Sequence, residues 1–77
     1  MIKIRERLKT KQQLEKIYGI ENYYDFLINQ WILGYKDNLI RLYKYLTLKE
    51  RKLFILYLLD IKINEYEMII HYILLNS

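Results

Sequence analysis

Few side chains in this sequence could carry out catalysis, and their positions assign most of them to other roles. Outside tyrosine, the hydroxyl groups belong to Thr10, Thr47 and Ser77. Both threonines stand directly before helical patterns, where a side-chain oxygen is expected to cap the helix. There is no cysteine, which excludes a thiolate nucleophile and a cysteine metal site. This set of residues predicts a protein that is not an enzyme.

The remaining titratable groups also lack the spacing of a reactive site. His71 is the single histidine, and no cysteine or second histidine is present to complete a metal site with it. Glu65 and Glu67 stand two positions apart on an expected helix and therefore do not face each other. Gly19 and Gly34 are too far apart for a glycine-rich phosphate loop. We therefore expect no metal, no cofactor and no small-molecule substrate.

The spacing of apolar residues predicts an all-α fold, a compact bundle of about five short helices in a single domain over residues 1–77. Apolar side chains recur every three or four residues, which is the helical period. Gly19 and Gly34 fall where two of these patterns stop, and the chain has no proline to break the others. The expected helices cover residues 11–18, 23–33, 35–46, 48–60 and from about 65 to about 75.

Four of the expected helices carry an apolar stripe that would face a core. The fourth helix differs, because the run from Leu53 to Leu59 is apolar on all sides. Such a helix is either central or meets another molecule with its outer face. Thr47 and Glu50 before this run match a capping box. In such a box the threonine hydroxyl accepts a hydrogen bond from a backbone amide of the first turn, and the carboxylate accepts one from the threonine's own amide. The expected inward residues are Leu14, Ile17 and Tyr18; Tyr24, Leu27, Ile28 and Trp31; Tyr35, Leu39, Leu42, Tyr43 and Leu46; and Tyr66, Ile69, Ile70 and Ile73.

The N-terminal segment 2–9 alternates between apolar and charged side chains. A period of two is a strand pattern, yet Ile4 and Leu8 also have helical spacing. A helix, an extended arm that is ordered only on binding, and an edge strand all remain open for this segment.

Positive charge gathers in two regions of the chain, whose formal net charge is +4. Residues 1–16 carry six basic and two acidic side chains, and residues 36–52 carry six basic and two acidic ones. Either region could meet an acidic protein or a phosphate backbone.

Two local patterns resemble nucleic-acid-binding families, each over part of the chain. The basic alternating opening followed by two helices resembles a ribbon–helix–helix repressor, which implies that Lys3, Arg5 and Arg7 would enter the major groove. The segment from Leu46 to Glu67 resembles the first two helices of a sigma-factor region-4 helix-turn-helix. A small DNA- or RNA-binding regulator is therefore the alternative function, using the basic residues of the N-terminal segment and of residues 36–52.

The bulk of the apolar side chains favours a protein that binds other proteins. The chain has 13 Ile, 14 Leu and 9 Tyr but no Ala or Val, more bulk than so short a chain is expected to bury. The codon usage of an AT-rich genome is the competing explanation. We expect a small regulator or inhibitor, of the kind carried by phages, that binds a host protein or forms a homodimer. The expected contact residues are Tyr23, Phe26, Trp31 and Tyr45, with Arg5, Arg7, Arg51 and Lys52 steering the encounter.

The sequence also predicts where the protein acts. The longest apolar run, Leu53 to Leu59, has seven residues, whereas about 20 are needed to cross a bilayer. The N-terminus lacks the apolar core of a secretory signal. We expect a cytoplasmic protein (in the host cytoplasm if a phage encodes it) and no membrane partner.

Overall fold

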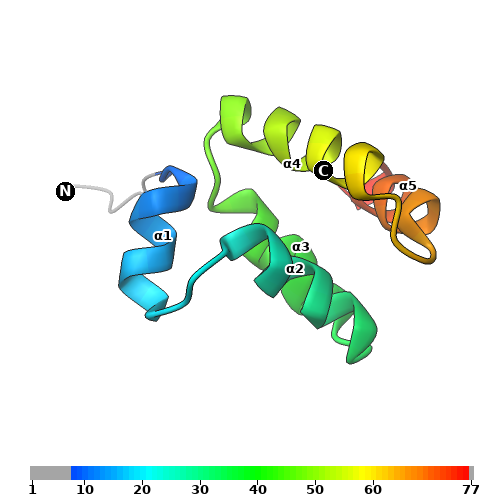
Figure 1. Ribbon diagram of the computed structural model, residues 1–77, viewed down its shortest axis with the longest axis horizontal. Coiled ribbons are helices and arrows are strands. Elements are labelled where there is room, and N and C mark those ends of the chain that lie inside the picture. Colours follow the sequence, from blue (N-terminus) through cyan, green and yellow to red (C-terminus); the bar gives the residue numbers. More distant parts are fainter. Residues whose placement is uncertain (1–7, 77) are drawn as a thin grey trace, which may run out of the picture.

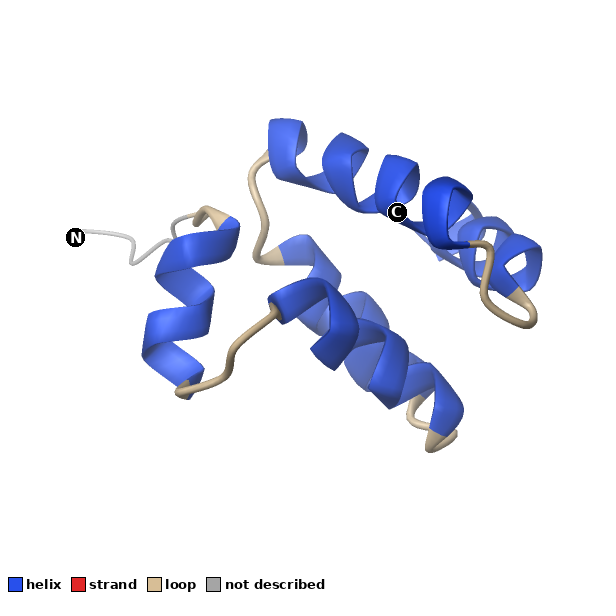
Figure 2. Cartoon of the chain, viewed as in Figure 1, coloured by secondary structure: helices blue, strands red, loops and turns tan. Residues whose placement is uncertain are grey.

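Five helices follow one another along the part of the chain that the computed structural model describes, residues 8–76 (Figures 1 and 2). The helices α2 and α3 lie side by side, α1 stands against α2, and α4 and α5 form a second hairpin. Over residues 8–76 the backbone forms helices and one isolated bridge but no strand, which confirms the predicted all-α bundle. The helix bounds are α1 Lys11–Tyr18, α2 Tyr23–Ile32, α3 Lys36–Lys44, α4 Leu48–Ile61 and α5 Tyr66–Asn76.

Side-chain caps fix the starts of three helices. The Thr10 hydroxyl accepts a bond from the Gln13 amide at 3.2 Å, and the Gln13 side chain accepts one from the Thr10 amide at 3.0 Å, which is a complete capping box. The Asn22 side chain caps α2 by accepting a bond from the Asp25 amide at 3.1 Å. Thr47 accepts a bond from the Glu50 amide at 3.2 Å, but the Glu50 carboxylate accepts the Tyr24 hydroxyl at 2.8 Å. The predicted box at Thr47 is therefore half formed, because its acidic member ties α4 to α2.

The core lies between the α2–α3 hairpin and one side of α4 and α5. Most residues of the predicted stripes are buried, and α2 contributes more of them than any other helix. Three expectations were wrong: Ile17, Tyr18 and Tyr35 are exposed, because they lie at the ends of short helices, where packing is incomplete. The Tyr18 ring contacts Tyr23 and Phe26 of α2 but remains 41% exposed. The buried apolar residues are Leu14, Tyr23, Tyr24, Leu27, Ile28, Trp31, Leu39, Leu42, Tyr43, Leu46, Phe54, Leu58, Ile69 and Ile73.

The chain just before α1 pairs with the linker between α3 and α4. The Lys9 amide donates to the Tyr45 carbonyl at 2.7 Å, and the Thr47 amide donates to the Lys9 carbonyl at 3.1 Å. These bonds make an isolated parallel bridge between Lys9 and Leu46. A helix, an extended arm and an edge strand were the alternatives for residues 2–9. Residues 2–7 of that segment lie outside the described part of the chain.

The turn after α4 begins with a lysine in the left-handed conformation. Lys62 has φ 47°, and its amide donates to the Leu58 carbonyl at 3.0 Å, which ends α4. A side chain at this φ costs energy that glycine avoids. We expect Lys62→Gly to raise the free energy of unfolding by about 0.5–1 kcal/mol in urea denaturation.

Lys16→Gly provides the matched control, because Lys16 lies within α1 in the ordinary helical conformation. There the same change should lower the free energy of unfolding by about 1 kcal/mol. Equal losses in the two variants would contradict the assignment of strain to residue 62.

Candidate functional site

The second hairpin leaves most of its apolar side chains in contact with solvent. Of the residues in α4, only Phe54 and Leu58 are buried, and of those in α5 only Ile69 and Ile73. Both helices are nonetheless apolar over most of their girth. The exposed apolar side chains of the two helices are Leu48, Leu53, Leu56, Leu59, Ile61, Met68, Leu74 and Leu75.

The side of α4 opposite its buried residues carries three leucines. Leu53, Leu56 and Leu59 follow at intervals of three residues and are 41%, 58% and 44% exposed. Lys52 and Asp60 are exposed on the same side. We call these five residues the α4 outer stripe. In Figure 1, α4 runs along one edge of the molecule and no other element covers its outer side.

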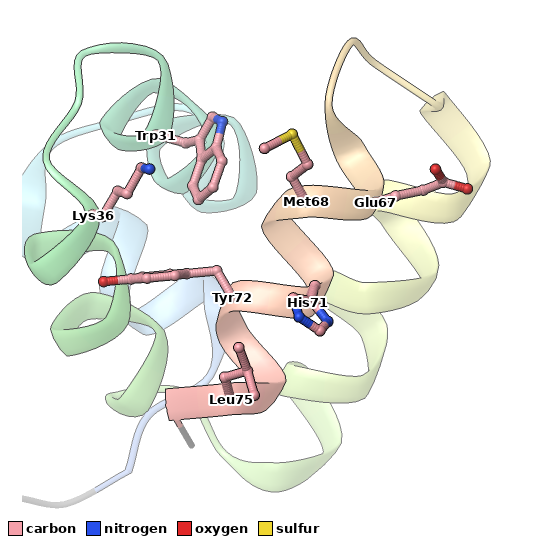
Figure 3. A pocket seen from close by; sticks show the side chains of 7 residues that line it. All are labelled: Trp31, Lys36, Glu67, Met68, His71, Tyr72 and Leu75. Carbon is pink, nitrogen blue, oxygen red and sulfur yellow. The ribbon is translucent and has the colours of Figure 1, made fainter.

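A second apolar surface lies where α5 meets the junction of α2 and α3. An open pocket of about 450 Å³ is present there (Figure 3). Met68 points from α5 toward Trp31, and the Tyr72 side chain extends toward α3. Met68 and Leu75 are 56% and 70% exposed, so they provide an accessible apolar wall. We call this site the α5 pocket; it is lined by Trp31, Lys36, Glu67, Met68, His71, Tyr72 and Leu75.

Aromatic and charged contacts hold one wall of the α5 pocket in place. The Trp31 and Tyr72 rings meet edge to face with centroids 5.8 Å apart. The Lys36 ammonium lies 4.7 Å from the Trp31 ring centroid and 5.9 Å from that of Tyr72. The Trp31 indole N–H donates to a Glu65 carboxylate oxygen at 3.0 Å. The wall is therefore ordered before any partner arrives, which lowers the entropy lost on binding.

The structure places two of the predicted contact residues in the core. Tyr23 is 0% exposed and Trp31 is 9% exposed, so both lie in the core. For Trp31 this agrees with its place on the predicted inward stripe, whereas the expectation that Tyr23 lies off that stripe was wrong. Tyr23 is drawn inward because its hydroxyl donates to the Leu42 carbonyl at 2.8 Å. Trp31 is covered by Tyr72 and bonded to Glu65, and only part of its ring reaches the pocket.

The other predicted contact residues do not form one surface. Phe26 and Tyr45 are half-buried, and the Tyr45 hydroxyl accepts a bond from Arg41. Arg51 donates to the carbonyls of Leu46 at 3.0 Å and Lys44 at 2.7 Å, so it fastens the end of α3 to the start of α4. Lys52 is exposed on the α4 outer stripe. Arg5 and Arg7 lie outside the described residues.

Sequence reasoning did not select Met68, Leu75 or Leu56. Met68 and Leu75 are seven residues apart, which puts them on one side of α5 beside the inward stripe. That second apolar stripe is the sequence feature from which Met68 and Leu75 could have been predicted. Leu56 could have been predicted from the apolar run Leu53 to Leu59, because the leucines on the outer side of that run are exposed.

Two features are absent from residues 8–76. In that range no group of three or more His, Cys, Asp or Glu side chains is placed to hold a metal ion. No helix in the same range is long and apolar enough to cross a membrane.

The fold and these two surfaces define a small all-α bundle with an apolar outer hairpin. Comparison with known proteins finds no matching family model, no similar curated protein and no similar solved structure.

Proposed function

We propose that this protein is a small non-enzymatic interaction module that binds another protein through the exposed side of the α4–α5 hairpin. The supporting observation is the contrast within the hairpin. Its two helices bury two side chains each, while eight large apolar side chains on them remain exposed. Bound there, the protein regulates or inhibits its partner by occupying the partner's surface.

The physical reason is the cost of leaving such a surface in water. A helix that is apolar all round is normally buried all round. Removing apolar surface from water stabilises the bound state by about 25 cal/mol per Å², before the entropy lost on binding is subtracted. Leucine and methionine side chains on two adjacent helices supply that area to a partner, and the preformed wall around Trp31 limits what ordering costs.

The basic residues of 36–52 support protein binding over the alternative nucleic-acid function. Several of them have contacts within the fold. Arg51 bonds two carbonyl groups, Arg41 bonds Asn38 and Tyr45, and Lys36 lies over Trp31. Cations committed to such contacts are less available to a phosphate backbone.

The test is capture of a partner by the purified protein from a lysate of its source cells, with and without nuclease, across a series of salt concentrations. We expect a discrete protein to be retained after nuclease treatment and at high salt, because apolar contacts are insensitive to screening. Leu75→Asp, which puts a charge into the α5 pocket, and Leu56→Asp, on the α4 outer stripe, should each weaken retention if the partner covers that part of the hairpin.

Ile32→Asp is the matched control, because Ile32 is an equally exposed apolar residue on α2, outside the hairpin. It should leave retention unchanged. Retention that nuclease abolishes, or that falls steeply with salt, would instead establish the nucleic-acid function. Equal retention by the wild type and all three variants would contradict the proposal.

A further inference from the structure

The α4 outer stripe has a pattern that reads alike in both directions from Leu56. Leu56 lies on the side of α4 opposite Phe54 and Leu58, the residues that α4 buries. Three residues before and after it are Leu53 and Leu59. All three leucines are exposed. The apolar part of the stripe is therefore symmetric about its centre.

The charges of the stripe are opposite at its two ends. Lys52 stands four residues before Leu56 and Asp60 stands four residues after it, and both are exposed. If two such helices lie antiparallel with the Leu56 residues at the same level, Lys52 of each helix comes level with Asp60 of the other. A parallel arrangement would place lysine level with lysine and aspartate level with aspartate, which is repulsive.

We propose that the α4 outer stripe binds a second copy of this chain, with the two α4 helices antiparallel about a two-fold axis at Leu56. This inference rests on the proposed function, since it names one protein that the hairpin binds. A two-fold interface must be complementary to itself, so residue i of one copy meets residue j of the other and the reverse. The stripe meets this condition in both its leucines and its charges.

The antiparallel register also orders the contacts along the helix pair. The two Leu56 side chains meet at the axis. Leu53 of each copy comes level with Leu59 of the other, and the lysine–aspartate level lies just beyond. The long lysine side chain can cover the leucines with its methylene groups while its ammonium reaches the aspartate. Charges at the rim and leucines at the centre are the usual anatomy of a protein interface.

The first test measures molar mass in solution by sedimentation equilibrium over a range of concentrations for the full chain, Leu56→Asp and Ile32→Asp. We expect the wild type and Ile32→Asp to dimerise alike. Leu56→Asp should raise the dimer dissociation constant by about 100-fold or more, since the axis brings two added carboxylates together. A wild type that stays monomeric at every concentration overturns the proposal, and so does a Leu56→Asp variant that dimerises normally.

The second test reads the register from the charges and changes only exposed residues. Lys52→Asp alone and Asp60→Lys alone should each weaken the dimer by about tenfold at low salt, because each places like charges level with one another. The double variant Lys52→Asp/Asp60→Lys should restore wild-type affinity. Failure of the double variant to restore it overturns the antiparallel register. Circular dichroism of every variant confirms that the helices are intact, and this second test stands even if Leu56→Asp unfolds.

The outcomes separate this inference from the proposed function. A monomeric wild type whose captured partner is lost in the Leu75→Asp variant leaves the function standing and removes the dimer. A dimer that Leu56→Asp disrupts, combined with no captured partner, identifies the second copy as the protein bound. Neither dimer nor captured partner removes both proposals.

Discussion

Replacing Phe54 with alanine is expected to lower the free energy of unfolding by about 3–5 kcal/mol, the usual cost of removing a buried aromatic side chain. Phe54 is completely buried. Its ring centroid lies 5.3 Å from that of Tyr24 and 6.0 Å from that of Tyr43, so it joins α4 to both α2 and α3. No other side chain of α4 except Leu58 is buried. The loss should therefore fall mainly on the attachment of the hairpin.

Urea denaturation and amide hydrogen exchange together check this expectation. Exchange in α4 and α5 should accelerate in Phe54→Ala before exchange in α2 and α3 does. Leu56→Ala is the control on the opposite side of the same helix. In the monomer it should change the free energy of unfolding by less than about 0.5 kcal/mol. A loss of that small size in Phe54→Ala would mean that α4 is held by something other than this side chain.

Alkaline pH is expected to unfold the protein, because buried or hydrogen-bonded tyrosines keep their protons in the fold beyond their usual range. Burial raises the pKa of the Tyr23 hydroxyl well above its usual value of about 10. Burial, and then the hydrogen bond to Glu50, do the same to the pKa of Tyr24. The hydrogen bond to Asp25 at 2.6 Å, followed by burial, raises the pKa of Tyr57 to about 12.

The direction of the effect follows from which state holds the protons. Between about pH 10 and the folded-state pKa values, the unfolded chain has lost these protons and the folded chain retains them. The stability that the tyrosines contribute is therefore complete below about pH 10 and is lost as the pH rises toward the folded-state values. For each of Tyr23 and Tyr24, which are buried, the slope is about 1.4 kcal/mol per pH unit.

Denaturation midpoints measured across this alkaline range, together with tyrosinate absorbance, provide the check. The tyrosinate signal of Tyr23 and Tyr24 should appear only as the helices melt. Tyr23→Phe should flatten the pH dependence, although it also lowers stability at neutral pH by removing the bond to the Leu42 carbonyl. Tyr35→Phe, at an exposed position, is the control for removing one tyrosine hydroxyl. Tyrosinate absorbance that precedes unfolding would contradict the assignment.

The parts of the fold that the sequence predicts well are those where apolar and polar residues alternate at a helical period. In α3, Leu39, Leu42 and Tyr43 recur among charged residues, and all three are buried as predicted. Gly19 also marks the end of α1 as expected. In these segments local chemistry and tertiary packing favour the same conformation.

The candidate site was less predictable because its two helices are apolar on most sides, so no polar face marks which side is exposed. In α4, periodicity could not tell Phe54, which is buried, from Leu56, which is not. Only the position of α4 against Tyr24 and Tyr43 decides which side is inward. For a related reason Tyr23 was placed wrongly, and Trp31 was expected both on an inward stripe and at a partner contact. Their polar atoms find partners, in Leu42 and Glu65, that lie 19 and 34 residues away in the sequence.

The bridge between Lys9 and Leu46 determines where a fusion partner or tether can be attached. Because Lys9 is held beside the α3–α4 linker, anything joined upstream of it enters the fold on the α1 side of the molecule (Figure 1). The α5 pocket lies at the far end, among α5 and the junction of α2 and α3. Immobilising the protein on a sensor through its first residues therefore presents the α5 pocket outward, whereas a tag joined after α5 would crowd it.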